Sequence, residues 1–264
     1  MRARRRVLPL AALLLVAGLV LAGCGGDGGP PRAPDASKPT LTVSAAASLK
    51  KAFTAYGKEF QAADARFSFA GSDELAAQIR QGVKPDVFAA ANTKLPDQLF
   101  AKGLVEKPTV FAGNRLVLAV PAEGGKVTSL TDLERQGVTV AIGAPSVPVG
   151  SYTRTVLGKL PASRSRAIMA NVRSEEPDVA GIVGKLTQGA VDAGFVYVSD
   201  VRGTDGKLET IELPDEAQPS VAYGVALVKG AKQPTQAEAF IDGLVSGPGQ
   251  RQLEAAGFEP PPSG

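Results

Sequence analysis

Hydrophobic and polar positions follow two different periods along the chain from about residue 40 onward. Short apolar runs, typical of buried strands, are separated by stretches with apolar residues three and four positions apart, which are typical of helices. We expect strands at 41–43, 67–69, 86–89, 115–120, 138–142, 193–197 and 221–228. Strands that alternate with helices predict an α/β architecture.

Three segments carry apolar residues at clear helical spacing, and we expect helices over 49–60, 152–160 and 179–186. In the first segment, Leu49, Phe53, Tyr56 and Phe60 fall on one face. In the second, Thr153 is the imperfect member of the apolar face.

Small, hydroxylated or turn-forming residues recur where the predicted helices begin. These starts are Ser48, Gly71-Ser72, Pro148-Val149-Gly150 ahead of a helix from about Ser151, and Asp178-Val179, and Ser129 with Asp132 indicates a fifth helix start. A helix N-terminus presents unpaired backbone N–H groups and a positive dipole end, so several that converge form an anion site. Ordinary capping also explains any one of them, and periodicity alone does not show convergence.

The N-terminal segment has the features of an export signal. Four arginines lie within residues 1–6, and the apolar run over 7–21 is short for a bilayer span. A basic start, a short apolar stretch and small residues before a cut site predict a secretory signal peptide over 1–23, and a single membrane anchor helix is the alternative. Leu21-Ala22-Gly23-Cys24 resembles a bacterial lipoprotein signal, which implies that Cys24 is acylated. The Gly- and Pro-rich residues 24–39 then read as the lipidated cysteine and a flexible linker.

Composition and charge narrow the possible functions. The 264 residues carry a formal net charge of +3, but residues 1–23 hold four Arg and no acid, so removing them leaves −1. The apparent basicity therefore belongs to the leader, and we expect no nucleic-acid partner. The chain has no His and one Cys, which excludes intramolecular disulfides, His-based triads and ordinary zinc sites.

Several motifs, in order, resemble the periplasmic molybdate-binding proteins of ABC transporters, over about residues 40–258. They are Leu41-Thr42-Val43-Ser44-Ala45-Ala46-Ala47-Ser48-Leu49, Phe69-Ala70-Gly71-Ser72, Pro85-Asp86-Val87-Phe88-Ala89, Asn114-Arg115-Leu116-Val117-Leu118-Ala119-Val120-Pro121, Val147-Pro148-Val149-Gly150-Ser151-Tyr152 and Gly194-Phe195-Val196-Tyr197-Val198-Ser199-Asp200. Each motif is moderately specific, and their order and spacing make the resemblance strong.

The resemblance implies a two-lobed periplasmic-binding-protein fold of type II. Each lobe is then a mixed sheet flanked by helices, with the ligand in the cleft between the lobes. The first lobe would comprise 40–113 and 221–262, and the second 114–220. The family's oxyanion contacts fall on five residues of this chain: the hydroxyl donors Ser48, Ser72 and Tyr197 and the main-chain donors Val149 and Val179.

The chemistry of such a site agrees with the residue types. An ionised tetrahedral dianion offers only acceptors, so hydroxyl and backbone N–H donors suit it. Two departures stand out: Val149 replaces the family's usual Ala, which adds bulk, and Asp73 follows Ser72 directly. An inward Asp73 would repel a dianion or accept the proton of hydrogen phosphate, whereas on a solvent-facing first turn it complements the helix dipole, which we expect.

These observations predict a lipid-anchored receptor, monomeric and on the outer face of the cell membrane. It would bind molybdate, and tungstate similarly, without a cofactor or a metal cation, and deliver it to an ABC permease driven by a cytoplasmic ATPase. A receptor for sulfate or phosphate is the nearest alternative. Serine-based catalysis through Ser48 and Lys51 is disfavoured because the companion motifs of that enzyme class are missing, and a purely structural lipoprotein leaves the helix starts without a purpose.

Overall fold

The computed structural model describes residues 38–262. The predictions for the leader, for Cys24 and for most of the linker fall on residues outside this range. Lys38 begins one compact unit that runs to the C-terminus. Within residues 38–262, none of the helices has the length of apolar sequence that crossing a bilayer requires.

A first mixed sheet has the strand order β2-β1-β3-β10-β4. Its strands are β1 (Thr40–Ala46), β2 (Asp64–Ala70), β3 (Val87–Ala90), β4 (Thr109–Asn114) and β10 (Val221–Leu227). Strand β1 pairs in parallel with β2 and β3, whereas β10 runs antiparallel to β3 and β4. The carboxyl ends of β1, β2 and β3 therefore point to the same edge of this sheet.

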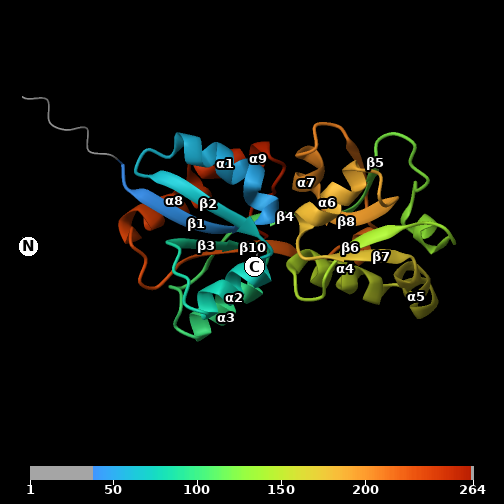
Figure 1. Cartoon of the computed structure of the whole chain (residues 1–264), viewed down its shortest axis with the longest axis horizontal. Helices are drawn as coiled ribbons and strands as arrows, with labels where there is room; N and C mark the ends of the chain where they lie inside the picture. The colour runs from blue at the N-terminus through green and yellow to red at the C-terminus, as the bar shows by residue number, and fades with distance from the viewer. Residues whose placement is uncertain (1–37, 263–264) are drawn as a thin grey trace, which may run out of the picture. The chain divides into compact units, whose positions relative to one another are not determined.

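Helices cover both faces of the first sheet, and we call the whole the first lobe. One face carries α1 (Lys50–Glu59), α8 (Pro234–Ser246) and α9 (Pro248–Ala255), and the other carries α2 (Ser72–Arg80) and α3 (Lys94–Ala101) (Figure 1). Strand β3 alternates between the two cores: Val87 packs with the first group, and Phe88 packs with the second. Both faces are buried, so the strand is apolar throughout rather than alternating.

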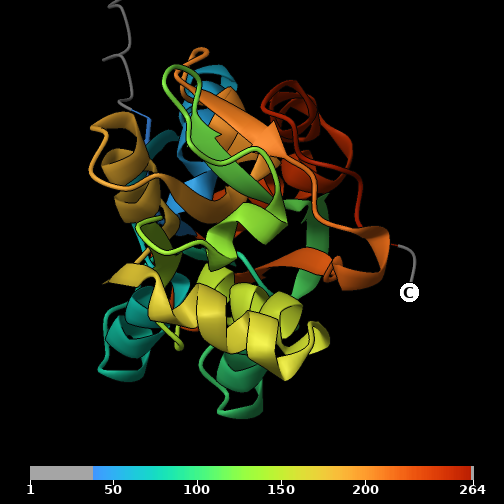
Figure 2. The ribbon, with the colours of Figure 1, turned by 90° about the vertical axis from the view of Figure 1, so that its right-hand side faces the viewer.

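A second mixed sheet, with its helices, forms the second lobe. Its strand order is β7-β6-β8-β5-β9, made of β5 (Leu116–Pro121), β6 (Val140–Gly143), β7 (Val172–Glu176), β8 (Ala193–Tyr197) and β9 (Leu208–Ile211). Its helices are α4 (Pro148–Lys159), α5 (Ala162–Ala170), α6 (Val179–Thr187) and α7 (Val198–Arg202). Figure 2 looks onto this lobe, with α4 and α5 in yellow in front.

The chain crosses between the two sheets twice, first from β4 to β5 and then from β9 to β10, through the short 3-10 helix Asp215–Ala217. The two-lobed α/β architecture with mixed sheets and flanking helices is thereby confirmed. All seven expected strands are present, although β6 begins at Val140 rather than Val138.

Three strands were not expected, and their sequences explain why. Strand β7 is Val172-Arg173-Ser174-Glu175-Glu176, an edge strand with no fully buried position. Strands β4 and β9 also lie at sheet edges and have exposed residues among their positions. Edge strands expose side chains on which the apolar signal of a buried strand depends.

One expected helix boundary was wrong. Pro148, Val149 and Gly150 do not precede a helix starting near Ser151, because they form the first turn of α4. Proline is well suited to the first helical turn, where its missing N–H would have no intrahelical partner. Thr153 is fully buried in this helix, and its hydroxyl donates to the Val149 carbonyl at 2.7 Å, which satisfies it on the apolar face.

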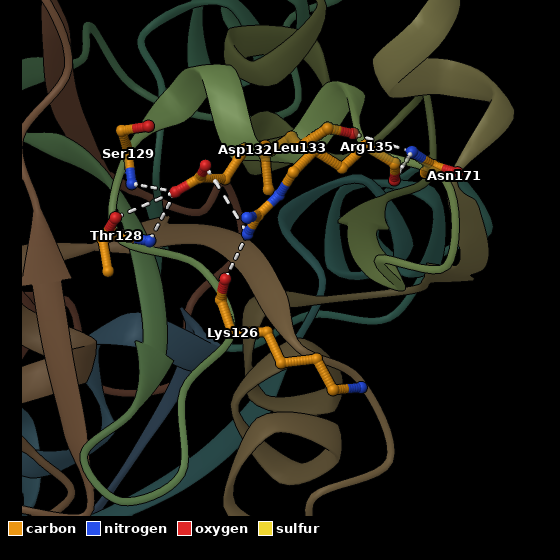
Figure 3. Close-up of polar contacts among 7 residues, drawn as sticks. All are labelled: Lys126, Thr128, Ser129, Asp132, Leu133, Arg135 and Asn171. Atoms are coloured by element: carbon orange, nitrogen blue, oxygen red, sulfur yellow. Dashed lines mark hydrogen bonds and ion pairs between the residues drawn. The ribbon is translucent and has the colours of Figure 1, made fainter.

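Ser129 and Asp132 do begin a helical segment, but it is the short 3-10 helix Leu130–Glu134. The Asp132 carboxylate accepts hydrogen bonds from the backbone N–H groups of Thr128 at 2.8 Å and Ser129 at 3.0 Å (Figure 3). These hydrogen bonds, that from Thr128 above all, lower the pKa of Asp132 to about 2. Asn171 donates to the Leu133 carbonyl at 2.8 Å, so both ends of the segment are fixed.

Candidate functional site

A small cavity lies between the lobes and brings all five predicted site residues together. It is lined by three groups of residues: Ala46, Ala47 and Ser48; Ala70, Gly71, Ser72 and Ala91; and Val147, Pro148, Val149, Asp178, Val179 and Tyr197. The cavity has a volume of about 20 Å³, counted as the space open to the centre of a water molecule. Because about 10–15 Å³ by this measure accommodates one water, the cavity suits a small inorganic ion rather than an organic metabolite.

The first lobe contributes two serine hydroxyls from the carboxyl ends of parallel strands. Ser48 lies in the 3-10 helix Ala47–Leu49 directly after β1, and Ser72 is the first residue of α2, separated from β2 by Gly71 alone. The Ser72 Oγ accepts a hydrogen bond from the Ala91 backbone N–H at 3.1 Å. A backbone N–H only donates, so the Ser72 hydroxyl proton remains free to point into the cavity.

The second lobe contributes two helix N-termini. Val149 is the second residue of α4, and Val179 is the first residue of α6. The N–H groups of a first helical turn have no intrahelical acceptor, and they carry the positive end of the helix dipole. Asp178 caps α6 by accepting from the Gly181 N–H at 2.9 Å, a bond that leaves the Val179 N–H free.

Val149 occupies its position without closing the cavity. Its side chain is 2% exposed and packs toward Gly143, where an added Cβ would lie 2.7 Å from the Val149 Cγ1. Gly150 permits this close packing, because a Cβ there would lie 2.0 Å from the Ala144 carbonyl oxygen. The extra bulk of Val149 is therefore accommodated between α4 and β6.

Tyr197, the last residue of β8, contributes a third hydroxyl. It is 1% exposed, and among residues 38–262 its Oη has no hydrogen-bond partner. Burial raises the pKa of this phenol well above its ordinary value, so Tyr197 stays neutral and keeps its proton. A buried hydroxyl without a partner costs free energy, so this group is poised to donate to a ligand.

The lining of the cavity offers hydrogen-bond donors but no cationic side chain. Of the thirteen lining residues none is Lys or Arg, and Asp178 alone carries a charge. Hydroxyls, backbone N–H groups and helix dipoles are thus the donors that the lining supplies. In the part of the chain that the structure describes, no cluster of three His, Cys, Asp or Glu side chains is placed to hold a metal ion.

Two further residues named from the sequence lie outside the cavity. Asp73, in the first turn of α2, lines a groove with Ser146 and Ser151 instead, and its half-buried side chain has one oxygen without a partner among the described residues. Lys51 donates to the Arg202 carbonyl at 3.2 Å, whereas the Ser48 Oγ is bonded to Tyr223. Lys51 is therefore not the base that a Ser-Lys pair requires.

Sequence reasoning missed a group of residues behind the cavity. The Tyr223 Oη lies 2.9 Å from the Ser48 Oγ, and Tyr223 is in β10, 175 positions along the chain. Asp200 lies behind Tyr197, whose backbone N–H donates to its Oδ2 at 3.0 Å. Burial raises the pKa of Asp200 to about 7. The hydrogen bond from Tyr197 lowers this pKa, and the negative charge of Asp178 raises it. Asp200 closes one of the motifs quoted above and is the third residue of α7, a local capping position, whereas no local pattern marks Tyr223.

Comparisons with known proteins agree with this geometry. The model of the family described as bacterial extracellular solute-binding protein matches residues 41–259. A Mycobacterium tuberculosis protein named molybdate-binding protein ModA is 37% identical over 258 residues, which cover 96% of this chain and 97% of the relative.

Two solved structures show the same fold. The periplasmic molybdate-binding protein of Azotobacter vinelandii has a TM-score of 0.76 at 22% identity, covering 84% of this chain and 99% of its own. The sulfate-binding protein SubI of Mycobacterium tuberculosis has a TM-score of 0.75 at 17% identity, covering 84% and 87%. At these identities the likeness concerns the fold alone.

The family match spans nearly all of the described residues, and it is consistent with a small cavity between two lobes. The chain belongs to the bacterial extracellular solute-binding proteins.

Proposed function

We propose that this protein is an extracytoplasmic receptor that captures molybdate between its two lobes and delivers it to an ABC permease. Tungstate, a dianion of nearly the same shape, would bind in the same way. One observation above all supports the proposal: donor groups from both lobes line one small cavity, and no cation lines it. The first lobe supplies its donors at two strand-to-helix junctions, and the second lobe supplies them at two helix starts and a tyrosine.

The proposed contacts are the hydroxyls of Ser48, Ser72 and Tyr197 and the backbone N–H groups of Val149 and Val179. We take residues 40–113 and 221–262 as the first lobe and residues 114–220 as the second. The two serines then belong to the first lobe, and the other three contacts belong to the second. A dianion that accepts from both sides at once favours the closed arrangement over the open one by its difference in affinity. Because dipoles rather than a buried ion pair hold the anion, opening does not have to separate two formal charges in a dry site.

The ligand is argued from the named relative as well as from the cavity. The Mycobacterium tuberculosis relative, 37% identical, is named for molybdate. The two solved structures are named for molybdate and for sulfate, so the fold is shared by receptors for either anion. Sulfate or phosphate therefore remains the alternative, and the experiment has to compare the anions directly.

A thermal-shift series with molybdate, tungstate, sulfate and phosphate tests the ligand. A ligand that binds only the folded protein increases the free energy of unfolding by mass action, by about 2.7 kcal/mol at a concentration a hundred times the Kd, and so raises the unfolding temperature. We expect molybdate and tungstate to raise it in the micromolar range and phosphate to leave it unchanged. Stabilisation by phosphate or sulfate with none by molybdate would contradict the proposal.

We further propose that residues 1–23 are removed as a signal peptide, that Cys24 is acylated, and that the mature monomer is held at the outer face of the membrane by this lipid. Labelling of expressing cells with a radioactive fatty acid tests the anchor. We expect the label on the wild-type protein and not on Cys24→Ser, which should leave the membrane fraction. Equal labelling of both would place the lipid elsewhere.

A further inference from the structure

A chain of buried side chains behind the cavity links Ser48 to both lobes. The Ser48 Oγ lies 2.9 Å from the Tyr223 Oη, and the Asn114 Nδ2 lies 3.4 Å from the same phenol oxygen. The Asn114 Nδ2 also donates to the Ser199 Oγ of the second lobe at 2.8 Å. All four side chains are buried, at 7% exposure or less. Tyr223 and Asn114 do not line the cavity, so they do not contact a ligand there.

One backbone N–H group sets the direction of each hydrogen bond between these four side chains. The Arg115 backbone N–H lies 2.9 Å from the Asn114 Oδ1. An N–H can only donate, so the Asn114 atom that it meets is the amide oxygen, and the opposite atom is the NH₂ group. That NH₂ group can only donate, so the Tyr223 Oη accepts from it.

The same reasoning fixes the Ser48 hydroxyl. Asn114 and Ser48 are the partners that the Tyr223 Oη has among the described residues, and Asn114 offers it only a donor. The phenol proton therefore goes to the Ser48 Oγ, since in the opposite direction a fully buried donor would have no acceptor. Ser48 accepts from Tyr223, and its own proton is left for the cavity.

We propose that Tyr223 is a positioning residue for the oxyanion site, which sets Ser48 as a hydrogen-bond donor, and that Asn114 sets the direction of Tyr223. This inference rests on the proposed function, because it concerns how that site holds its anion. Without the Tyr223 hydroxyl, Ser48 can turn its proton away from the cavity and present a lone pair, which a dianion repels.

The arrangement also places the direction-setting residue at a crossing between the lobes. Asn114 ends β4, directly before the chain enters β5 of the second lobe, and its NH₂ group contacts a residue of each lobe. Ser199 lies in the first turn of α7 and holds the amide from the second lobe. The direction of the Ser48 hydroxyl, a donor of the first lobe, therefore depends on Asn114 in the crossing from β4 to β5, about which the lobes would open.

A double-mutant cycle with Tyr223→Phe and Ser48→Ala tests the positioning role, with molybdate binding to the purified protein measured by calorimetry. Tyr223→Phe removes only the hydroxyl. We expect it to weaken binding about tenfold in the wild-type background and to have no further effect in the Ser48→Ala background, because it acts through Ser48. Equal losses in the two backgrounds would overturn the proposal, since a merely structural role would weaken binding whether or not Ser48 is present.

A matched control separates this effect from the loss of any buried phenol hydroxyl. The Tyr56 Oη donates to the Phe240 carbonyl at 3.2 Å inside the first lobe, away from the cavity. We expect Tyr56→Phe to lower the unfolding temperature and to leave the affinity unchanged. If the wild type and Tyr223→Phe bind molybdate with equal affinity, the positioning role is overturned and the proposed function stands. Wild-type protein that binds none of molybdate, tungstate, sulfate and phosphate would overturn the proposed function, and the positioning role with it.

Discussion

The Gly71 backbone in the first lobe lies against the Pro177 carbonyl in the second. A Cβ added to Gly71 would lie 2.5 Å from that carbonyl oxygen, far inside van der Waals contact. The Gly71 dihedral angles, φ −58° and ψ 135°, are open to any residue, so its conformation does not require glycine. The absence of a side chain here serves the close approach of the two lobes beside the cavity.

Gly71→Ala is therefore expected to hinder closure without harming either lobe. The added methyl group meets a backbone atom that cannot move away cheaply, so we expect about tenfold weaker anion binding and an unfolding temperature close to that of the wild type without ligand. Calorimetric titration and thermal unfolding measure the two quantities. The control is Gly158→Ala in α4, where an added Cβ has no neighbour within 4 Å. Wild-type affinity in Gly71→Ala would show that the lobes do not need this contact.

Ser48→Ala and Ser72→Ala each remove one hydroxyl donor from the cavity. A hydrogen bond to a charged group contributes about 1.5–3 kcal/mol, so each variant should lose at least tenfold in affinity. Ser68→Ala, at an exposed position of β2, should bind as the wild type does. Unchanged affinity in both cavity variants would place the site elsewhere.

Tyr197→Phe should have opposite effects on affinity and on stability. The Tyr197 Oη is buried without a partner among the described residues, so its removal costs the ligand-free protein nothing and relieves an unsatisfied donor. We expect an equal or higher unfolding temperature without ligand and about tenfold weaker anion binding, measured on the same preparation. Tyr152→Phe, whose ring centre lies 6.4 Å from that of Tyr197, serves as the control and should keep the affinity. A drop in stability with unchanged affinity would mean that Tyr197 has a packing role.

Anion binding should weaken as the pH rises through about 7, because of Asp200. Burial holds the pKa of this carboxyl at about 7, and the Asp178 charge contributes to the rise. A dianion in the cavity raises that pKa further, so the complex holds the Asp200 proton more tightly than the free protein does. By linkage, affinity is highest where Asp200 is protonated, falls as it ionises, and levels off above the pKa of the complex.

Calorimetric titration with molybdate at several pH values between about pH 6 and pH 8 measures this dependence. We expect an affinity loss of about three- to tenfold over this range, since a change of one unit charge near a partly screened site is worth about 1 kcal/mol. Asp200→Asn keeps an oxygen that accepts from the Tyr197 N–H and removes the charge, so its profile should be flat. A wild-type profile that is equally flat would contradict the coupling.

Much of the architecture could be predicted because its signals are local. The period of apolar residues around Phe53 and Ile182 identifies their helices, and the continuous apolar run from Ala193 to Tyr197 identifies a buried strand. Strand β7 was missed because it lies at an edge, where polar side chains such as Arg173 and Glu175 replace the apolar signal. Local periodicity reports burial, and an edge strand has little of it.

The sequence by itself determined the α/β class, most of the helix starts and, through the family resemblance, five of the residues that line the cavity. Only the tertiary structure decided that these residues meet, that the Tyr197 hydroxyl has no partner among the described residues, and that Tyr223 bonds Ser48 from 175 positions away. The reason is physical: helix and strand periods depend on neighbours along the chain. The direction of a buried hydrogen bond depends instead on which donors and acceptors folding brings together.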